Sequence, residues 1–127
     1  MQVIEGLYYT KEHEWIKIDD NTATIGIADH AQEALGEITY VELPEIGKQV
    51  NAGEELAVVE STKAASDIYS PIAGKVTEVN DELESQPDII NKDCYGAGWI
   101  VKLQITGENL TEALMNAEEY KKFASSI

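Results

Sequence analysis

One lysine lies between two apolar runs in the stretch from residue 55 to residue 71. The runs Leu56 to Val59 and Ala65 to Tyr69 have the composition of strands. The residues between them, Ser61 to Ala64, suit a four-residue turn because serine is favoured at its first position. The pattern predicts a β-hairpin with Lys63 at its tip. Two paired strands would hold the lysine amine in a position where an enzyme can acylate it. Spacing alone leaves an ordinary surface lysine as an equal alternative.

Carboxylates and histidines near the N-terminus are the next residues that could do chemistry. Glu12 and Glu14 are two residues apart in a predicted strand, so their side chains should share one face and His13 the other. Imidazole serves in metal binding and in acid-base catalysis. His13 and His30 have no helix-face spacing and no third ligand pattern, so we expect them to pack or cap. The sequence has no Gly-x-Ser-x-Gly motif and no pairing of cysteine with histidine, which argues against a hydrolase.

The composition limits the class of protein and its partners. A chain of 127 residues with 43% hydrophobic content predicts a single domain spanning residues 1–127. Nine basic and 24 acidic residues give a net charge of −15, which repels nucleic acid and anionic membrane surfaces and favours basic patches on partner proteins. Cys94 is the only cysteine, so an intrachain disulfide and a cysteine-rich zinc site are excluded. We expect a cytoplasmic protein, with a mature organelle protein as the alternative, because no targeting or membrane-spanning run is visible.

Short alternating segments separated by turns predict a mainly β fold. Strands are expected at Leu7 to Thr10, Glu14 to Ile18, Thr22 to Ile27, Ile38 to Leu43, Gly74 to Val79 and Trp99 to Ile105, in addition to the hairpin. The sequence contains a weak internal repeat, which consists of Gly47 to Val50 and Gly74 to Val76. This repeat fits two similar half-sheets packed face to face.

Three further regions carry helix signals. A short helix from His30 to Leu35 should begin at an Asp29 cap supported by Gln32 and end at Gly36. Residues 81–91 are acidic and interrupted by Pro87, which predicts a loop with one helical turn on either side. A C-terminal helix should begin at a cap formed by Asn109 and Glu112. Its apolar face would comprise Leu110, Ala113, Leu114, Ala117, Tyr120 and Phe123.

The segment Glu60 to Asp67, reading ESTKAASD, resembles the lipoylation site of the glycine cleavage system H protein family, whose lysine holds lipoic acid in amide linkage. Other segments have the order and spacing seen in that family, namely His13-Glu14-Trp15, Ala23 to Ile27, Asp29 to Gln32, Val41 to Pro44 and Gly98-Trp99. The resemblance covers nearly the whole chain. It implies the barrel-sandwich hybrid of lipoyl and biotinyl carriers, with a short internal helix and a C-terminal helix.

The resemblance also implies a function and a set of site residues. Lipoyl-Lys63 would shuttle the aminomethyl group of glycine from the PLP-dependent glycine decarboxylase to the tetrahydrofolate-dependent aminomethyltransferase, and dihydrolipoamide dehydrogenase would reoxidise the arm. A lipoate-attaching enzyme would load it. The chain itself would be a non-catalytic carrier and a monomer. Glu14 and Asp67 match positions that hold the loaded arm in the family, Glu12 stands where some members have serine, and His30 would line the entry to the cleft.

Two departures and two alternatives accompany the resemblance. Thr62 stands where a valine usually precedes the modified lysine, and Ala28 stands where a threonine is frequent. Thr62 could weaken recognition by the lipoate-attaching enzyme. A biotinyl carrier would show methionines on both sides of its lysine, where this chain has Thr62 and Ala64. An H-like relay protein, which donates lipoyl groups to other dehydrogenase complexes, has the same hairpin and stays open as an alternative.

Overall fold

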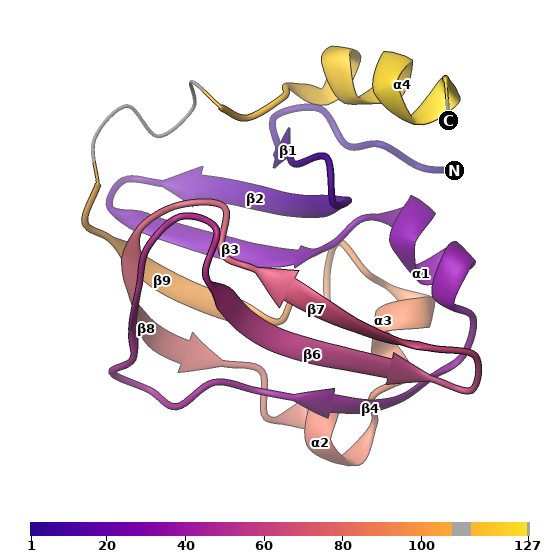
Figure 1. Ribbon diagram of the computed structural model, residues 1–127, viewed down its shortest axis with the longest axis horizontal. Coiled ribbons are helices and arrows are strands. Elements are labelled where there is room, and N and C mark those ends of the chain that lie inside the picture. Colours follow the sequence, from indigo (N-terminus) through magenta and orange to yellow (C-terminus); the bar gives the residue numbers. More distant parts are fainter. Residues whose placement is uncertain (108–112, 127) are drawn as a thin grey trace.

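The structure is a computed structural model that describes residues 1–107 and 113–126. Its strands are β1 (Tyr8–Tyr9), β2 (Glu14–Asp19), β3 (Thr22–Ile27), β4 (Ile38–Glu42), β5 (Gln49–Val50), β6 (Glu55–Ser61), β7 (Ala65–Tyr69), β8 (Gly74–Val79) and β9 (Val101–Ile105). Its helices are α1 (Asp29–Leu35), α2 (Glu82–Ser85), α3 (Ile89–Lys92) and α4 (Ala117–Ser125). Figure 1 shows α4 above β1, on the opposite side of the molecule from α2.

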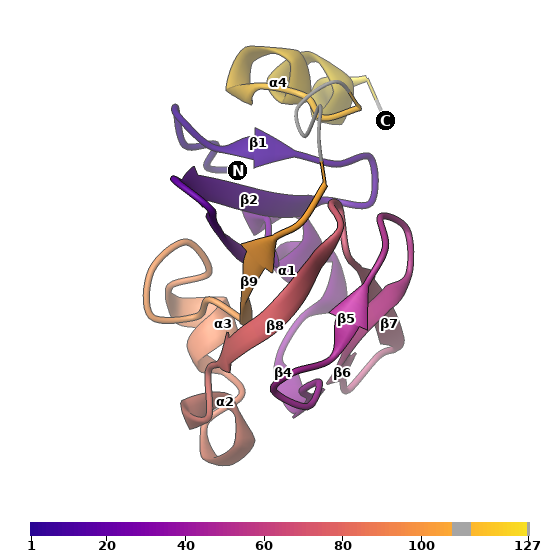
Figure 2. The same ribbon diagram turned by 90° about the vertical axis from the view of Figure 1, so that its left-hand side faces the viewer.

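Two antiparallel sheets share one apolar core. The larger has the strand order β1-β2-β3-β9-β8-β5, and the smaller has the order β4-β6-β7. Figure 2 shows the smaller sheet beside β8 and β9. Buried residues from both sheets make up the core, among them Ile16, Ile25 and Leu103 from the larger and Val41, Val59 and Ile68 from the smaller. The expected mainly β fold with short internal and C-terminal helices is confirmed.

The two sheets differ in size, contrary to the expectation of two similar halves. The two segments of the repeat pair with each other in the larger sheet, where Gln49 lies opposite Lys75 and Val50 opposite Gly74. The chain between them leaves this sheet to form the β6–β7 hairpin of the smaller one. The two similar segments are therefore neighbouring strands of the larger sheet, and the β6–β7 hairpin between them belongs to the smaller sheet.

The short internal helix is present, but the predicted Asp29 cap is wrong. Ala28 occupies the N-cap position without a side-chain hydrogen bond, and Asp29 is the first helical residue. The Asp29 carboxylate instead accepts from the backbone N–H of Gln2 at 2.6 Å and from Gln32 Nε2 at 2.7 Å. A long-range hydrogen bond from the Gln2 N–H to the Asp29 carboxylate has thus replaced the local cap. Gly36 ends the helix as expected, and its N–H donates to the Gln32 carbonyl at 3.0 Å.

The remaining helices test the other local signals. The single turns expected on either side of Pro87 are present as α2 and α3. The predicted Asn109 cap lies outside the described residues. The prediction that residues 113–116 are helical is wrong, because Met115 and Tyr9 exchange two backbone hydrogen bonds of 2.8 and 2.9 Å. The helix instead begins at Ala117, with Asn116 as its N-cap and a capping box formed by Asn116 and Glu119. The helix packs through buried Tyr120, whose ring stacks on Tyr9 at 4.3 Å.

Gly26 makes close packing of β2 on β3 possible, which gives a testable prediction. It lies opposite Trp15, and a Cβ at this position would come within 2.6 Å of the indole ring. The ring cannot move aside because it is buried and its Nε1 donates to the Cys94 carbonyl at 2.9 Å. Gly26→Ala should therefore lower the free energy of unfolding by about 1–3 kcal/mol, measured by urea denaturation. Thr24→Ala on the same strand is the control, and an equal loss in both variants would contradict this account.

Candidate functional site

The tip of the β6–β7 hairpin is organised by Ser61. Its backbone N–H donates to the Ala64 carbonyl at 2.8 Å, and its Oγ accepts from the N–H groups of Lys63 and Ala64 at 3.1 and 3.2 Å. The turn predicted from the sequence is therefore present, and Lys63 is exposed at its tip. Because the flanking strands belong to a three-stranded sheet packed on the core, the amine is carried on a rigid support.

The Lys63 side chain extends from the hairpin tip and lies against the C-terminal end of α1. A Cβ placed on Gly36 would lie 3.4 Å from Lys63 Cε and 3.6 Å from its Nζ, so the lysine stem rests against this glycine. Gly36 has φ of 80°, a left-handed conformation that favours glycine. Figure 1 shows the hairpin tip at the edge of the molecule, beside α1 and the start of β4.

Glu14 is buried at the junction of the two sheets, with 2% of its surface exposed. One carboxylate oxygen accepts from the Thr10 hydroxyl at 3.0 Å, and the other accepts from the Tyr69 N–H at 2.8 Å. Burial raises the pKa of this carboxyl to about 7, although both hydrogen bonds act to lower it. Glu14 therefore titrates near neutrality and links the first residue of β2 to the last residue of β7.

Glu12 and Glu14 lie on one cavity, although not because they share a strand. The strand begins only at Glu14, and His13 has φ of 67°, so the strand expected over residues 12–14 is wrong, although His13 does not line this cavity. Turn hydrogen bonds cause this, since the His13 N–H donates to the Thr10 carbonyl at 3.1 Å. The cavity has a volume of about 380 Å³ and is lined by Thr10, Lys11, Glu12, Glu14, Gly53, Tyr69, Ser70, Pro71, Ala113, Leu114 and Met115.

Asp67 lies outside that cavity, on the exposed face of β7. It is opposite Val58, and it is two residues before Tyr69, whose N–H reaches Glu14. Residues two apart on a strand share a face, so Asp67 lies on the β7 surface between the hairpin tip and Glu14. Ala65 to Tyr69 spans about 13 Å at the usual rise of a strand. Asp67 thus lies on the hairpin arm that begins beside Lys63 and ends at Tyr69, where the arm contacts Glu14 of β2.

The histidines pack together, as expected. The rings of His13 and His30 stack with centroids 4.1 Å apart, and His13 Nδ1 is 2.7 Å from the Tyr120 hydroxyl. Burial and the neighbouring His30 lower the pKa of His13. Among the residues that the structure describes, no cluster of three or more potential metal ligands occurs. His30 does not line the cavity that holds Glu12 and Glu14, and its place at the entry to a cleft stays a prediction.

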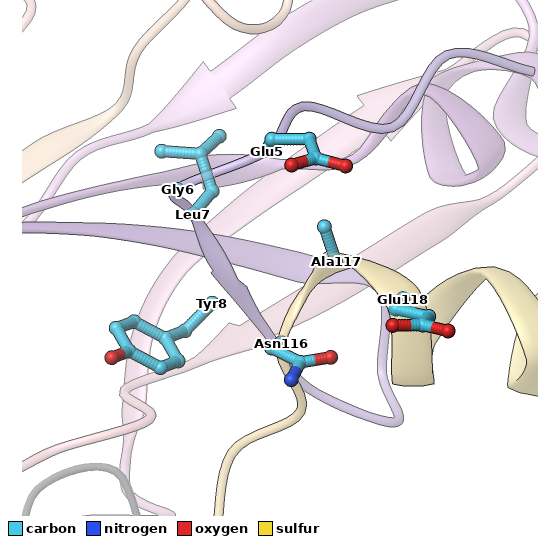
Figure 3. A pocket seen from close by; sticks show the side chains of 7 residues that line it. All are labelled: Glu5, Gly6, Leu7, Tyr8, Asn116, Ala117 and Glu118. Carbon is cyan, nitrogen blue, oxygen red and sulfur yellow. The ribbon is translucent and has the colours of Figure 1, made fainter.

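Other features are remote from this hairpin. A cavity of about 250 Å³ lies between the N-terminal segment and the start of α4. Figure 3 shows the residues that line it, Glu5, Gly6, Leu7, Tyr8, Asn116, Ala117 and Glu118. None of the predicted site residues lies on it. Cys94 is buried, and burial raises the pKa of its thiol to about 12, so it is a poor nucleophile. Across the described ranges, every helix is too short or too polar to cross a bilayer.

Comparisons with known proteins identify the family. The family model described as "Glycine cleavage H-protein" matches residues 7–127. The chain belongs to the glycine cleavage H-protein family. The H protein of Coprothermobacter proteolyticus is 52% identical over 97% of this chain and 98% of its own length. A probable glycine cleavage system H protein of Pyrococcus abyssi is 52% identical over 99% of this chain and 95% of its own length.

A solved structure agrees with the sequence comparisons. The crystal structure of a glycine cleavage system H protein from Mycobacterium marinum superposes with a TM-score of 0.88 at 40% identity, covering 97% of this chain and 99% of that one. The resemblance seen in the sequence is therefore confirmed over the whole fold. As an H-protein family member, the chain is a carrier component of the glycine cleavage system and not one of its enzymes.

Proposed function

We propose that this chain is the lipoyl shuttle between the enzymes of glycine cleavage and that Lys63 is the residue that carries lipoate. The observation that carries the proposal is an exposed amine on a turn fixed by Ser61, at the end of a sheet that packs on the core. These residues fit an amide-linked group, because the lysine is accessible to an attaching enzyme and its support need not move. The bound lipoyl group would supply a disulfide that accepts an aminomethyl group by reductive transfer.

Glu14 and Glu12 are proposed to hold the cationic amine at the end of a loaded arm. Both lie on the cavity at the far end of β7, and Asp67 lies on the way from Lys63 to it. A carboxylate in a largely buried position attracts an ammonium group more strongly than one in water does, because the local dielectric constant is low. Glu14 is the stronger candidate, since Thr10 and Tyr69 fix its orientation.

The partners proposed are glycine decarboxylase, aminomethyltransferase, dihydrolipoamide dehydrogenase and a lipoate-attaching enzyme. We further propose a cytoplasmic monomer that forms one domain over residues 1–127, in accord with the shared core of the two sheets. The relay function, donation of lipoyl groups to other dehydrogenase complexes, is the alternative that the same hairpin allows.

The two functions are separated by the reaction that the lipoylated protein supports. We expect it to restore glycine-dependent bicarbonate exchange when it is added to glycine decarboxylase. Unlipoylated protein from the same preparation is the control and should be inactive. Absence of exchange together with transfer of the lipoyl group to a dehydrogenase acyltransferase domain would favour the relay.

The outer face of the β4–β6–β7 sheet supplies a prediction about docking. Cross-strand pairs put Tyr40 beside Glu60 and Glu42 beside Val58 and Asp67 on this face, while Val59 and Ile68 face the core. In the described residues, the two ion pairs are Lys92–Asp88 and Lys102–Glu78, so these three carboxylates have no cationic partner there. The face belongs to the hairpin that carries Lys63, so a basic partner surface would meet it.

Removing charge from this face should slow association with the decarboxylase. We expect the double variant Glu42→Gln and Glu60→Gln to associate roughly threefold more slowly at low salt, with less difference at high salt, because the charges steer the encounter. The double variant Glu82→Gln and Glu84→Gln on α2 has the same net charge and is the matched control. Equal slowing by both variants in stopped-flow binding would contradict a specific role for this face.

A further inference from the structure

A hydrogen bond joins the C-terminal helix α4 to the turn that carries Glu14. His13 Nδ1 lies 2.7 Å from the Tyr120 hydroxyl, and these two residues are 107 positions apart in the chain. The Tyr120 ring also stacks on Tyr9, with centroids 4.3 Å apart and an angle of 4° between the ring planes. Tyr120 is fully buried, so this side chain anchors α4 to the body of the protein through two contacts.

The turn from Thr10 to Glu14 presents side chains to two different parts of the molecule. Glu12 and Glu14 line the cavity of about 380 Å³, whereas His13 does not line it and stacks on His30, with centroids 4.1 Å apart. His13 has φ of 67°, a left-handed conformation that costs free energy in any residue other than glycine. The contacts of the His13 ring therefore help to keep this turn in the conformation that directs Glu14 into the cavity.

The segment that leads into α4 forms one wall of the same cavity. Ala113, Leu114 and Met115 line this wall, and all three side chains are uncharged. The Met115 N–H donates to the Tyr9 carbonyl at 2.9 Å, and the Met115 carbonyl accepts from the Tyr9 N–H at 2.8 Å. Because α4 begins at Ala117, a displacement of the helix would also displace this wall.

We propose that Tyr120 and His13 are positioning residues for the amine site, through which α4 keeps water away from the aminomethyl group of a loaded arm. This inference rests on the proposed function of Glu14. Without the hydrogen bond, the turn can relax from its left-handed conformation and the apolar wall can separate from the carboxyl. Water would then weaken the attraction between carboxylate and ammonium and would reach the carbon–sulfur bond of the loaded arm.

The first test follows the Glu14 carboxyl by ¹³C NMR in unlipoylated protein and compares Tyr120→Phe with wild type. The phenylalanine ring keeps the stack on Tyr9 and lacks only the hydroxyl that His13 contacts. Burial holds the pKa of Glu14 at about 7, so entry of water should lower the midpoint towards 4.5 by roughly one pH unit or more. The other ionisable groups on the cavity are the same in both proteins, namely Lys11, Glu12 and Tyr69.

Tyr95→Phe is the matched control, because it also removes one hydroxyl from the aromatic cluster around Tyr9. The Tyr95 hydroxyl accepts from the Asp29 N–H at 3.2 Å and donates to the Gln2 carbonyl at 2.7 Å, and neither partner belongs to the turn or to α4. We expect this variant to keep the wild-type titration of the carboxyl. Equal midpoints in wild type and Tyr120→Phe, or an equal shift in both variants, would overturn the positioning role.

The lifetime of the loaded arm, followed by mass spectrometry, gives a second readout. Hydrolysis adds water to the methylene carbon, and its bonds to sulfur and nitrogen break to leave formaldehyde, an ammonium ion and the free thiol. We expect this loss to be roughly threefold faster in Tyr120→Phe than in Tyr95→Phe, the factor that corresponds to losing one net hydrogen bond from the closed site. Equal rates in these two variants would overturn the inference. A lifetime that Glu14→Gln leaves unchanged would overturn the proposed amine site instead, and the titration, which needs no lipoyl group, would still decide the positioning role.

Discussion

Lys63→Arg is expected to abolish carrier activity and to leave the fold unchanged. The guanidinium group stays protonated at any working pH and cannot take the place of the lysine amine in amide formation. Lys63 is exposed and forms no ion pair among the described residues, so the free energy of unfolding should change by less than about 0.5 kcal/mol. Glycine-dependent bicarbonate exchange should fall to the level seen without the protein.

Lys75→Arg on β8 is the matched control for that variant. It makes the same chemical change at another exposed lysine, one that lies in the larger sheet opposite Gln49. We expect full exchange activity in this protein. Residual lipoate-dependent activity in Lys63→Arg, or equal loss in both variants, would mean that another amine carries the arm.

Glu14→Gln should change how stability depends on pH. The folded-state pKa is about 7 against an ordinary value of 4.5, so stability from this group is fully present below pH 4.5 and is lost as the pH rises to 7. Relative to wild type, the variant should therefore become more stable by about 2 kcal/mol between pH 5 and pH 8, measured by urea unfolding. The amide can satisfy both partners, because its oxygen can accept from the Tyr69 N–H while its NH₂ donates to Thr10 Oγ1.

His13 also makes stability depend on pH, and the comparison of Glu14→Gln with wild type cancels its contribution. Its pKa is lowered from 6.5, so its contribution is present above pH 6.5 and is lost as the pH falls below that value, the opposite of Glu14. Both proteins keep His13, so its effect cancels in their difference. A difference that stays constant from pH 5 to pH 8 would contradict the raised pKa of Glu14.

The same substitution tests the proposed amine site. If the Glu14 carboxylate holds the ammonium group of a loaded arm, retention should weaken below pH 7 in wild type, as Glu14 takes up a proton. Retention should be weak at every pH in Glu14→Gln. Hydrolytic loss of the aminomethyl group, followed by mass spectrometry, measures this directly. Equal lifetimes of the loaded state in both proteins would remove Glu14 from the site.

Local signals predicted the elements that local interactions decide. Ser61 organises the hairpin tip with hydrogen bonds to residues within three positions, and Pro87 separates two single helical turns as expected. Long-range contacts decided the rest. The Tyr9–Met115 pairing keeps residues before Asn116 out of the helix, and the Asp29 carboxylate binds the Gln2 N–H rather than capping α1.

The site was predicted only in part for the same reason. Lys63 could be located from its flanking residues, and its role came from the resemblance. One hydrogen bond to the buried Glu14 comes from the Tyr69 N–H, 55 residues away, and no local pattern predicts that contact. The contact between His13 and Tyr120 joins residues 107 positions apart, and no local pattern predicts it either. Gly36 was interpreted only as a helix stop, although the same glycine also leaves room for the lysine stem.

The most direct test is the mass of the protein co-expressed with a lipoate ligase, followed by fragmentation of the peptide that contains residues 55–71. We predict one lipoyl increment on the intact chain and its assignment to Lys63, in spite of Thr62 at the preceding position. An unmodified wild-type chain under conditions that fully modify another H protein, or an increment on a different lysine, would contradict the account.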